Sequence, residues 1–340
     1  MCKGKKIIVL GATGNVGREI LNVISEFPDF TNSYIVACAT RFSLGAKVSC
    51  GQKVLKIVSL EDVNLQKGDI VLSAIGGSNI AKLADGITST GAILVDNSSY
   101  FRTNPDIPLI IPEINPEEIS KVKNKNIIAN PNCSTIQVLM ALYSLHNSFK
   151  IKRIIASTYQ AVSGAGKAMM DTLFNQTKKM FEGAPDITPN TEKQIAFNCV
   201  PKIGDWTEEG YTQEEMKMTM ETKKIMNDES IGVSATCVRV PVFNCHAVSI
   251  NVEFNKPFTI ENVEQILYDT NGIIYNDNRY GDNFKTQSEC SQTDAVFISR
   301  LRQDLSNEKA LNMWIVADNL RKGAALNAVQ IAKLLLDKGF

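Results

Sequence analysis

The stretch Lys5-Lys6-Ile7-Ile8-Val9-Leu10-Gly11-Ala12-Thr13-Gly14-Asn15-Val16-Gly17 decides the fold of the N-terminal part of this 340-residue chain. Its apolar run is typical of a buried parallel strand, and the amphipathic residues 18–27 predict a helix directly after the glycines. A strand, a glycine turn and a helix in this order are the context of a dinucleotide-binding fingerprint, here spaced GxxGxxG. Glycines let the backbone approach a pyrophosphate at the helix N-terminus. A purely structural turn is the alternative interpretation.

Further apolar runs predict how the chain is divided. Short buried strands are expected at 33–39, 69–75, 92–96 and 126–129, which predicts a Rossmann-type doubly wound parallel sheet. The pattern changes after residue 150, where strands at 153–160, 231–242, 245–250 and 311–317 are separated by longer connections. These predict an α+β domain with a mixed sheet. We expect residues 1–130 and 318–340 to form the nucleotide-binding domain, with its last helix covering the sheet, and 131–317 to form the catalytic domain.

The end of the second predicted strand indicates which nicotinamide cofactor is bound. An NAD enzyme usually places an acidic residue near this point, where it binds the ribose 2′-hydroxyl. Here Thr40 and Arg41 follow the strand instead. A hydroxyl and an arginine suit a 2′-phosphate, so the sequence favours NADP. A solvated loop arginine is the alternative.

Cys133 stands where a turn becomes a helix, in the stretch Asn130-Pro131-Asn132-Cys133-Ser134-Thr135-Ile136-Gln137. Apolar residues at nearly helical spacing predict a helix over 134–149. The backbone N–H groups of a first helical turn, with the positive end of the helix dipole, favour a thiolate. Cys133 is therefore a candidate nucleophile. A buried cysteine that serves as a small hydrophobic residue is the alternative.

Charged residues elsewhere have both a functional and a structural interpretation. Arg102 lies in a polar loop after a predicted strand, where open α/β sheets bind ligands. Glu214 and Lys217 share one face of a predicted helix, a spacing also found in solvated ion pairs. Arg239 falls inside a predicted apolar strand and needs a partner, either a bound carboxylate or an internal acid. Of the two histidines, His246 is better placed than His146 to act as the base for a cysteine nucleophile.

The composition excludes several classes of protein. Thirty-six basic and 36 acidic residues leave zero net charge, which argues against nucleic acid or an anionic membrane as a partner. No apolar run reaches the ~18 residues that span a bilayer. Eight cysteines without CxxC pairs and no signal peptide predict reduced thiols in a cytoplasmic protein, with no zinc site.

Seven motifs occur in one order along the chain and closely resemble the aspartate-semialdehyde dehydrogenase family. They are GATGNVG at 11–17, DNSSYFR at 96–102, NPNCSTIQ at 130–137, TYQAVSGAG at 158–166, GYTQEEMK at 210–217, CVRVPV at 237–242 with His246, and DNLRKGAALNAVQIA at 318–332. The resemblance implies an NADPH-dependent reductive dephosphorylation of L-4-aspartyl phosphate to L-aspartate 4-semialdehyde and phosphate. This reaction serves lysine, methionine, threonine and diaminopimelate biosynthesis.

The resemblance also implies a role for each matching residue. Cys133 would form an acyl thioester and His246 would act as acid and base. Asn132, Gln160, Glu214 and Arg239 would hold the substrate, and Arg102 and Lys217 the phosphate. The NADP site would comprise Gly11, Ala12, Thr13, Gly14, Asn15, Val16, Thr40, Arg41, Ser163, Gly164 and Asn319. The second domain would form the interface of a homodimer or of a dimer of dimers.

Two departures and two alternatives accompany this resemblance. Phe42 stands where family members often have Ser, and Ala247-Val248 stand where Ser-Glu is common. An N-acyl-glutamyl-phosphate reductase would share the fold and chemistry, but the QAVSGAG block and the NPNC turn favour the aspartyl enzyme. A catalytically silent NADP-binding sensor is the other alternative, and the intact Cys133, Gln160, Arg239 and His246 count against it.

Overall fold

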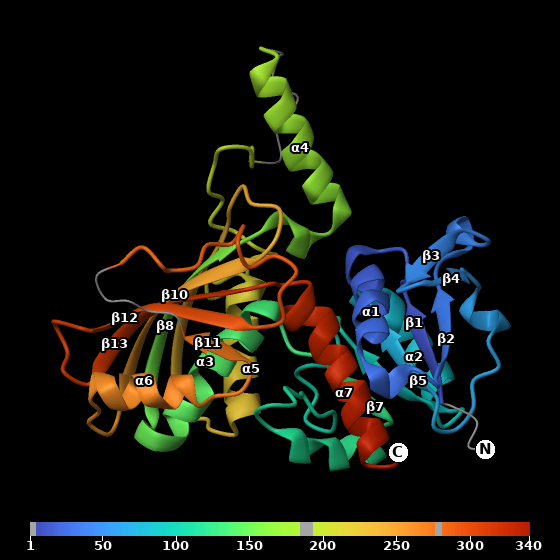
Figure 1. Cartoon of the computed structure of the whole chain (residues 1–340), viewed down its shortest axis with the longest axis horizontal. Coiled ribbons are helices and arrows are strands. Elements are labelled where there is room, and N and C mark those ends of the chain that lie inside the picture. The colour runs from blue at the N-terminus through green and yellow to red at the C-terminus, as the bar shows by residue number, and fades with distance from the viewer. Residues whose placement is uncertain (1–4, 184–192, 276–280) are drawn as a thin grey trace. The chain divides into compact units, whose positions relative to one another are not determined.

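The computed structural model describes residues 5–183, 193–275 and 281–340, which form two compact units. One unit holds the described residues up to 132 together with 323–340, and the other holds 133–322. These divisions fall two and five residues after the boundaries expected from the sequence. Each unit carries its own main sheet (Figure 1).

A parallel sheet of five strands forms the centre of the first unit, as predicted. Its order is β2-β1-β5-β6-β7, and every neighbouring pair runs parallel. The strands are β1 (Lys6–Leu10), β2 (Tyr34–Cys38), β5 (Ile70–Ser73), β6 (Ile93–Asp96) and β7 (Ile127–Ala129). A separate hairpin is formed by β3 (Lys47–Cys50) and β4 (Lys53–Lys56).

Helices cover both faces of this parallel sheet (Figure 1). The helices α1 (Asn15–Glu26) and α7 (Leu326–Asp337) pack in one apolar core with every second side chain of β1 and β5. The helix α2 (Gly77–Thr88) buries Ile80, Ala84 and Ile87 outside that core and contacts β6. Alternate side chains of a strand point to opposite faces, so the sheet is doubly wound, as the apolar runs predicted.

The glycine turn after β1 lies where the strand order reverses. The chain leaves β1 for β2 on one side and later returns to β5 on the other, so the carboxyl ends of β1 and β5 flank the switch point. Gly11 has φ +86°, a conformation that favours glycine. A Cβ on Gly17 would lie 2.1 Å from the Gly11 carbonyl oxygen, so only glycine fits here. The helix begins at Asn15, inside the stretch that the sequence assigned to the turn.

The second unit is built on a six-stranded mixed sheet. Its order is β11-β12-β13-β10-β8-β9, with parallel pairs β8–β9 and β11–β12 and antiparallel pairs between the others. The strands are β8 (Ile151–Gln160), β9 (Gly232–Arg239), β10 (His246–Phe254), β11 (Ile273–Tyr275), β12 (Val296–Gln303) and β13 (Ala310–Ala317). The mixed sheet predicted for the catalytic part is confirmed.

Helices of the second unit gather on one side of the mixed sheet (Figure 1). The helix α3 (Cys133–Phe149) contacts four strands and the helices α5 (Gln213–Met226) and α6 (Ile260–Tyr268). The helix α4 (Lys167–Phe181) projects away from the sheet instead. The opposite face keeps half-exposed apolar side chains, among them Ile155 and Tyr159.

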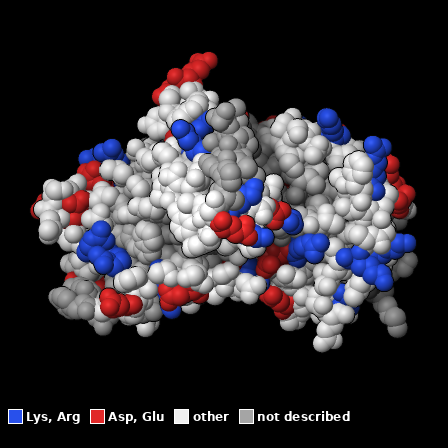
Figure 2. All heavy atoms as spheres, turned by 90° about the horizontal axis from the view of Figure 1, so that it is seen from above, with Lys and Arg blue, Asp and Glu red and all other residues white. Residues whose placement is uncertain are grey.

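Two further features of the molecule are the charges on its surface and the hydropathy of its helices. Figure 2 shows Lys and Arg interspersed with Asp and Glu on the face it presents, without a broad area of one sign. None of the helices in the described ranges has the length and apolar content needed to cross a bilayer.

Candidate active site

Three polar side chains lie in one row across neighbouring strands of the mixed sheet. Gln160, the last residue of β8, is paired with Arg239 on β9 and with His246 on β10. Directly paired residues of adjacent strands point to the same face of a sheet. All three are buried, although all are polar. Residues that are 86 positions apart in the chain, Gln160 and His246, thus become neighbours.

Arg239 ends its strand, so the prediction of a longer strand to residue 242 was wrong. The chain turns after Arg239, and the Val242 N–H bonds back to the Val240 carbonyl. The turn places the guanidinium at the sheet edge, where Nη1 donates to the Ala161 carbonyl at 2.8 Å. Burial lowers the pKa of Arg239, and the charge of Glu214 opposes this. Arginine remains protonated in proteins, so Arg239 offers a positive charge to an anionic ligand.

His246 is a neutral imidazole whose tautomer follows from one contact. The Ala161 N–H donates to Nδ1 at 3.1 Å, so Nδ1 carries the lone pair and Nε2 carries the proton. Complete burial, with the charge of Arg239, lowers the pKa of His246 from 6.5 to about 3. In the described part of the chain, Nε2 has no hydrogen-bond partner. The ring therefore presents one N–H donor to whatever occupies the site.

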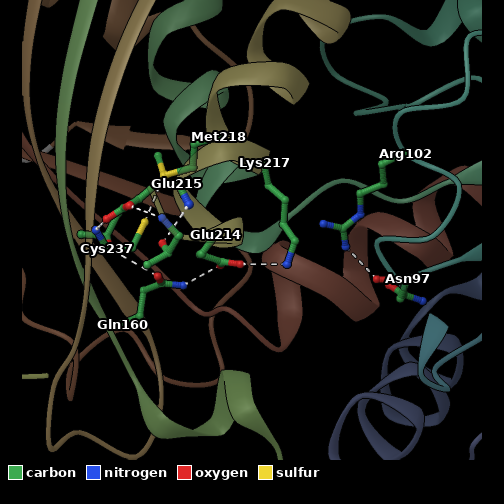
Figure 3. A network of polar contacts seen from close by, with 10 residues as sticks. Asn97, Arg102, Gln160, Glu214, Glu215, Lys217, Met218 and Cys237 are labelled. Carbon is green, nitrogen blue, oxygen red and sulfur yellow. Dashed lines mark hydrogen bonds and ion pairs between the residues drawn. The ribbon is translucent and has the colours of Figure 1, made fainter. Parts of the chain in front are cut away.

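A carboxylate at the start of α5 connects the row to a lysine (Figure 3). Gln160 Nε2 donates to Glu214 Oε1 at 3.0 Å, and Lys217 Nζ lies 3.1 Å from Glu214 Oε2. Glu214 is buried, with a side chain 8% exposed, while the Lys217 side chain is 27% exposed. The pair is therefore not the solvated helix pair that the sequence left open. A half-buried ammonium next to a buried carboxylate suits a site for charged ligands.

Cys133 is the first residue of α3, at the helix start that the sequence predicted. It is partly exposed, unlike the five described cysteines that are buried, so it is accessible to a substrate. Its sulfur acts electrostatically on Arg239, raising the pKa of the guanidinium. The preceding Asn132 is buried. These positions fit the nucleophile hypothesis, because a thiolate at a helix start near an arginine is stabilised in its reactive form.

Three of the predicted cofactor residues, Ser163, Gly164 and Asn319, lie beside His246 within the second unit. Asn319 Nδ2 donates to the Ser163 hydroxyl at 3.0 Å, and its Oδ1 accepts the Cys245 N–H at 2.9 Å. A Cβ on Gly164 would lie 3.1 Å from Arg239 Nη1 and 3.2 Å from His246 Nε2. Glycine at this position therefore leaves room directly against Arg239 and His246.

The predicted nucleotide residues of the first unit form a cradle at the switch point. Gly14 is the N-cap of α1 and contributes no capping side chain, so the backbone of residues 11–16 lines the helix N-terminus. A Cβ on Gly11 would lie 2.9 Å from the Ala74 carbonyl oxygen, which shows how closely the two strand ends approach. Thr40 and Arg41 are exposed after β2, with the Arg41 guanidinium 5.3 Å from the centre of the Phe42 ring. The turn suits the pyrophosphate of a dinucleotide, and Thr40 and Arg41 lie after the next strand of the sheet.

Arg102 is held at the end of β6 in the first unit. Its Nη2 donates to the Asn97 carbonyl at 2.7 Å (Figure 3), and the Arg102 side chain is buried. Asn130 Nδ2 donates to Asn97 Oδ1 at 2.9 Å, so the turn before Cys133 and the Arg102 loop share one anchor. Burial raises the pKa of Asp96, while the Ser98 hydroxyl, 2.5 Å from it, opposes this.

Glu215 and Thr158, which the sequence did not indicate as site residues, form hydrogen bonds with the strands that carry Gln160 and Arg239. Glu215 Oε1 accepts the Cys237 N–H at 2.9 Å, and its Oε2 accepts the Thr212 N–H at 2.7 Å. The second contact belongs to a capping box, whose Thr-x-x-Glu spacing is visible in the sequence. Thr158 accepts the Val238 N–H at 3.3 Å and donates to Gln160 Oε1 at 3.2 Å. Nothing local in the sequence indicates that role of Thr158, because it depends on pairing with β9.

Comparison with known proteins identifies the family. The family models described as "Semialdehyde dehydrogenase, NAD binding domain" and "Semialdehyde dehydrogenase, dimerisation domain" match residues 6–122 and 142–322. The chain is 45% identical over 339 residues to the aspartate-semialdehyde dehydrogenase of Rickettsia bellii, covering 99% of each chain. This chain belongs to the aspartate-semialdehyde dehydrogenase family. The fold, the family and the enzyme class predicted from the sequence are confirmed, and the two alternatives are not favoured.

Solved structures of aspartate-semialdehyde dehydrogenases agree with this assignment. Aspartate semialdehyde dehydrogenase II complexed with ASA, from Vibrio cholerae, matches with a TM-score of 0.95 and 44% identity, covering 99% of each chain. The enzyme with NADP from Candida albicans matches with a TM-score of 0.75 and 25% identity, covering 98% of this chain and 99% of the other. Both units thus have the folds of an enzyme that uses a nicotinamide cofactor. Among the described residues, no group of metal-ligating side chains is present.

His246 should make this protein less stable as the pH falls. Between pH 6.5 and about 3 the unfolded chain binds a proton on this ring that the folded chain excludes. The free energy of unfolding therefore falls as the pH drops through that window. We expect urea midpoints to fall less between pH 7 and pH 5 in His246→Asn than in the unchanged protein. Burial also lowers the pKa of His146. Because His146 is present in both proteins, its contribution to the pH dependence cancels in the comparison. Identical pH dependence in the two proteins would contradict the burial argument.

Proposed function

We propose that this chain catalyses the reversible, NADPH-dependent reductive dephosphorylation of L-4-aspartyl phosphate to L-aspartate 4-semialdehyde and phosphate, through a thioester on Cys133. The reaction would serve lysine, methionine, threonine and diaminopimelate biosynthesis, in the cytoplasm. None of the seven described cysteines forms a disulfide, which fits a reducing compartment.

The observation that carries this proposal is the row of Gln160, Arg239 and His246 with a carboxylate attached. An amino-acid substrate has an α-carboxylate and an α-ammonium group. Arg239 matches the carboxylate, because a guanidinium binds it through two parallel hydrogen bonds. Glu214 matches the ammonium group by charge. Gln160 lies between Arg239 and Glu214, since it is paired with Arg239 across the strands and donates to the Glu214 carboxylate.

Cys133 performs the covalent steps in this proposal. Its sulfur attacks the carbonyl carbon of the acyl phosphate, the carbon–oxygen bond to phosphate breaks, and a thioester remains. Bound NADPH supplies the hydride that reduces the thioester carbonyl. The carbon–sulfur bond then breaks, which releases the aldehyde and restores the thiolate. Cysteine suits both roles because it attacks well and also leaves well.

His246 assists where negative charge develops on the carbonyl oxygen. Its Nε2–H is the donor that faces the site, because the Ala161 N–H already occupies Nδ1. A preorganised donor in a water-poor site stabilises such an oxygen more than water does. This neutral tautomer is the resting form from which the acid and base role assigned to His246 would begin.

Three groups of residues would hold the cofactor in this proposal. Gly11, Ala12, Thr13, Gly14, Asn15 and Val16 suit the pyrophosphate, Thr40 and Arg41 the 2′-phosphate, and Ser163, Gly164 and Asn319 the nicotinamide end. The fit at the first group rests on the glycine contacts, since a side chain at Gly17 would fill the turn. Preference for NADP over NAD rests on Arg41 and on the absence of an acid at that strand end.

We also propose that a second copy of the chain covers the open face of the mixed sheet. This face presents Ile155 and Tyr159, which are 39% and 36% exposed. A pocket of about 300 Å³ lies on it, lined by Ser249, Phe284, Arg300, Arg302, Met313 and Trp314. Aromatic, methionine and arginine side chains are enriched at protein interfaces. The match of residues 142–322 to a dimerisation domain favours a homodimer, or a dimer of dimers.

Cys133→Ala should abolish turnover. The variant lacks the sulfur that forms the thioester, but its cofactor cradle is intact, so NADP affinity should stay within twofold of the unchanged protein. NADP reduction with aspartate semialdehyde and phosphate measures the first, and fluorescence titration with NADPH the second. Cys199→Ala, at an exposed cysteine that has no role in the proposed reaction, is the matched control. Appreciable semialdehyde oxidation by Cys133→Ala would refute the thioester.

Lys217→Met should raise the apparent KM for phosphate by about 10- to 100-fold, because a charge-assisted contact is lost. Arg102→Leu should act in the same direction, and Arg102→Lys should restore only part of the affinity, since a point charge cannot reproduce the guanidinium fork. The KM for NADP should not change in either case. Initial rates at varied phosphate measure this. Normal phosphate dependence in both neutral variants would place the phosphate elsewhere.

Arg41→Glu should weaken binding of NADP by about 10- to 100-fold and leave NAD binding nearly unchanged. The substitution replaces a favourable charge at the 2′-phosphate with a repelling one. Dissociation constants for the two cofactors, measured side by side, test the difference. Lys47→Glu, on the nearby hairpin strand β3, controls for the change in net charge. Equal loss for both cofactors would leave Arg41 with a structural role only.

Ile155→Lys should shift the protein toward monomers, because a charge would be buried in the proposed interface. Sedimentation velocity over a range of protein concentrations measures the shift. Val54→Lys makes a similar change at an exposed site on β4 and should leave the assembly unaltered. An unchanged sedimentation coefficient for Ile155→Lys would remove the open face from the interface.

A further inference from the structure

We propose that Thr158 is a positioning residue for the substrate site, whose hydroxyl fixes which way round the Gln160 amide lies. The inference rests on the proposed function, in which Gln160 holds the substrate. Thr158 and Gln160 are two residues apart on β8, so their side chains share one face of the sheet. Both are buried, with 0% and 1% exposure, and water cannot replace the contacts between them.

The Thr158 hydroxyl has one proton, and its contacts determine where that proton goes. The Val238 N–H donates to the hydroxyl oxygen at 3.3 Å, which uses an acceptor site of that oxygen. Gln160 Oε1, 3.2 Å away, only accepts, so the hydroxyl proton is directed to it. The nearby Cys237 thiol competes poorly, because sulfur is a weak acceptor and burial keeps the thiol neutral by raising its pKa to about 12.

This contact selects one of the two amide orientations of Gln160. With Oε1 toward Thr158, the Nε2 group faces Glu214 and donates to Oε1 of that carboxylate at 3.0 Å (Figure 3). The flipped amide would place its oxygen against a carboxylate oxygen, and two acceptors repel. In the free protein, Thr158 and Glu214 therefore hold the same orientation from opposite sides.

Of the two hydrogen bonds that orient the Gln160 amide, only the one from Thr158 would remain unchanged when substrate binds. In the proposed function an α-ammonium group approaches Glu214, whose Oε2 is already paired with Lys217. The ammonium group competes with Gln160 for the carboxylate, so the hydrogen bond between Gln160 and Glu214 weakens. In this proposal Thr158 has no contact with the ligand, so it would retain its bond to Gln160 Oε1. Its hydroxyl is thus the contact that keeps the amide oriented during binding.

The fixed orientation leaves one amide hydrogen for the substrate. Nε2 carries two hydrogens, and among the described residues its bond to Glu214 is its single hydrogen bond. The second N–H is buried, has no acceptor in the described part of the chain, and would donate to an oxygen of the substrate. An amide that can flip would also present its oxygen there, which would repel a carboxylate or carbonyl oxygen. Loss of the hydroxyl should therefore weaken substrate binding.

The test compares Thr158→Val, which removes the hydroxyl at nearly constant shape, with Thr158→Ser, which retains it. Thr158→Val should raise the KM for aspartate semialdehyde by about 3- to 10-fold, the size expected for one hydrogen bond. The KM for NADP and for phosphate should stay within twofold, and Thr158→Ser should match the unchanged protein. Thr236→Val makes the same chemical change at an exposed position of β9 and should have no effect.

A double-mutant cycle separates positioning from a structural role. In a Gln160→Ala background the amide is absent, so Thr158→Val should add no further change in the KM for aspartate semialdehyde. The same fold-change in both backgrounds, or a parallel rise in all three KM values with a lower melting temperature, would overturn the proposal. So would an unchanged KM in Thr158→Val. Absence of semialdehyde oxidation in the unchanged protein would overturn the proposed function together with this inference.

Discussion

The pairing of β8 with its two neighbours is the constraint on which the rest of the site depends. β8 runs parallel to β9 and antiparallel to β10, and both registers bring their functional residues to the same strand end. A shift of one residue in either register would turn that strand's side chains to the other face of the sheet. Gln160, Arg239 and His246 meet only because both registers hold. The backbone ladder, which is independent of side-chain chemistry, therefore aligns the chemistry.

Buried charge in the second unit is balanced by contacts that a substrate could share. Glu214 has a glutamine on one oxygen and a lysine on the other, and its charge opposes the effect of burial on Arg239. His246 avoids the cost by remaining neutral. Two backbone N–H groups of the edge strand β9 are also satisfied by side chains, Cys237 by Glu215 and Val238 by Thr158. These two contacts help to hold the strand that carries Arg239 in place beside β8.

The sequence predicted those features that depend on local pattern. The strand, glycine turn and helix at residues 5–26 follow from hydrophobic periodicity and from the steric freedom of glycine. The start of α3 at Cys133 follows from the turn residues before it and the apolar spacing after it. The end of β9 at Arg239 was missed because Val240 and Val242 continue the apolar pattern while the backbone turns. The local signal was Pro241, which has no N–H to donate to a strand ladder. Hydrophobic pattern reports burial, and it does not report where a ladder ends.

By itself the sequence determined the doubly wound sheet, the place of Cys133 at a helix start and, through its motifs, the family. It left the Glu214 and Lys217 pair undecided between a solvated surface and a site, because i, i+3 spacing is the same in both. Tertiary structure decided that pair by burying Glu214 against Gln160, and it alone set the tautomer of His246 through the Ala161 N–H. It also gave Thr158 a partner on β9. Burial and hydrogen-bond direction arise between segments that are distant in the chain, so periodicity and propensity carry no record of them.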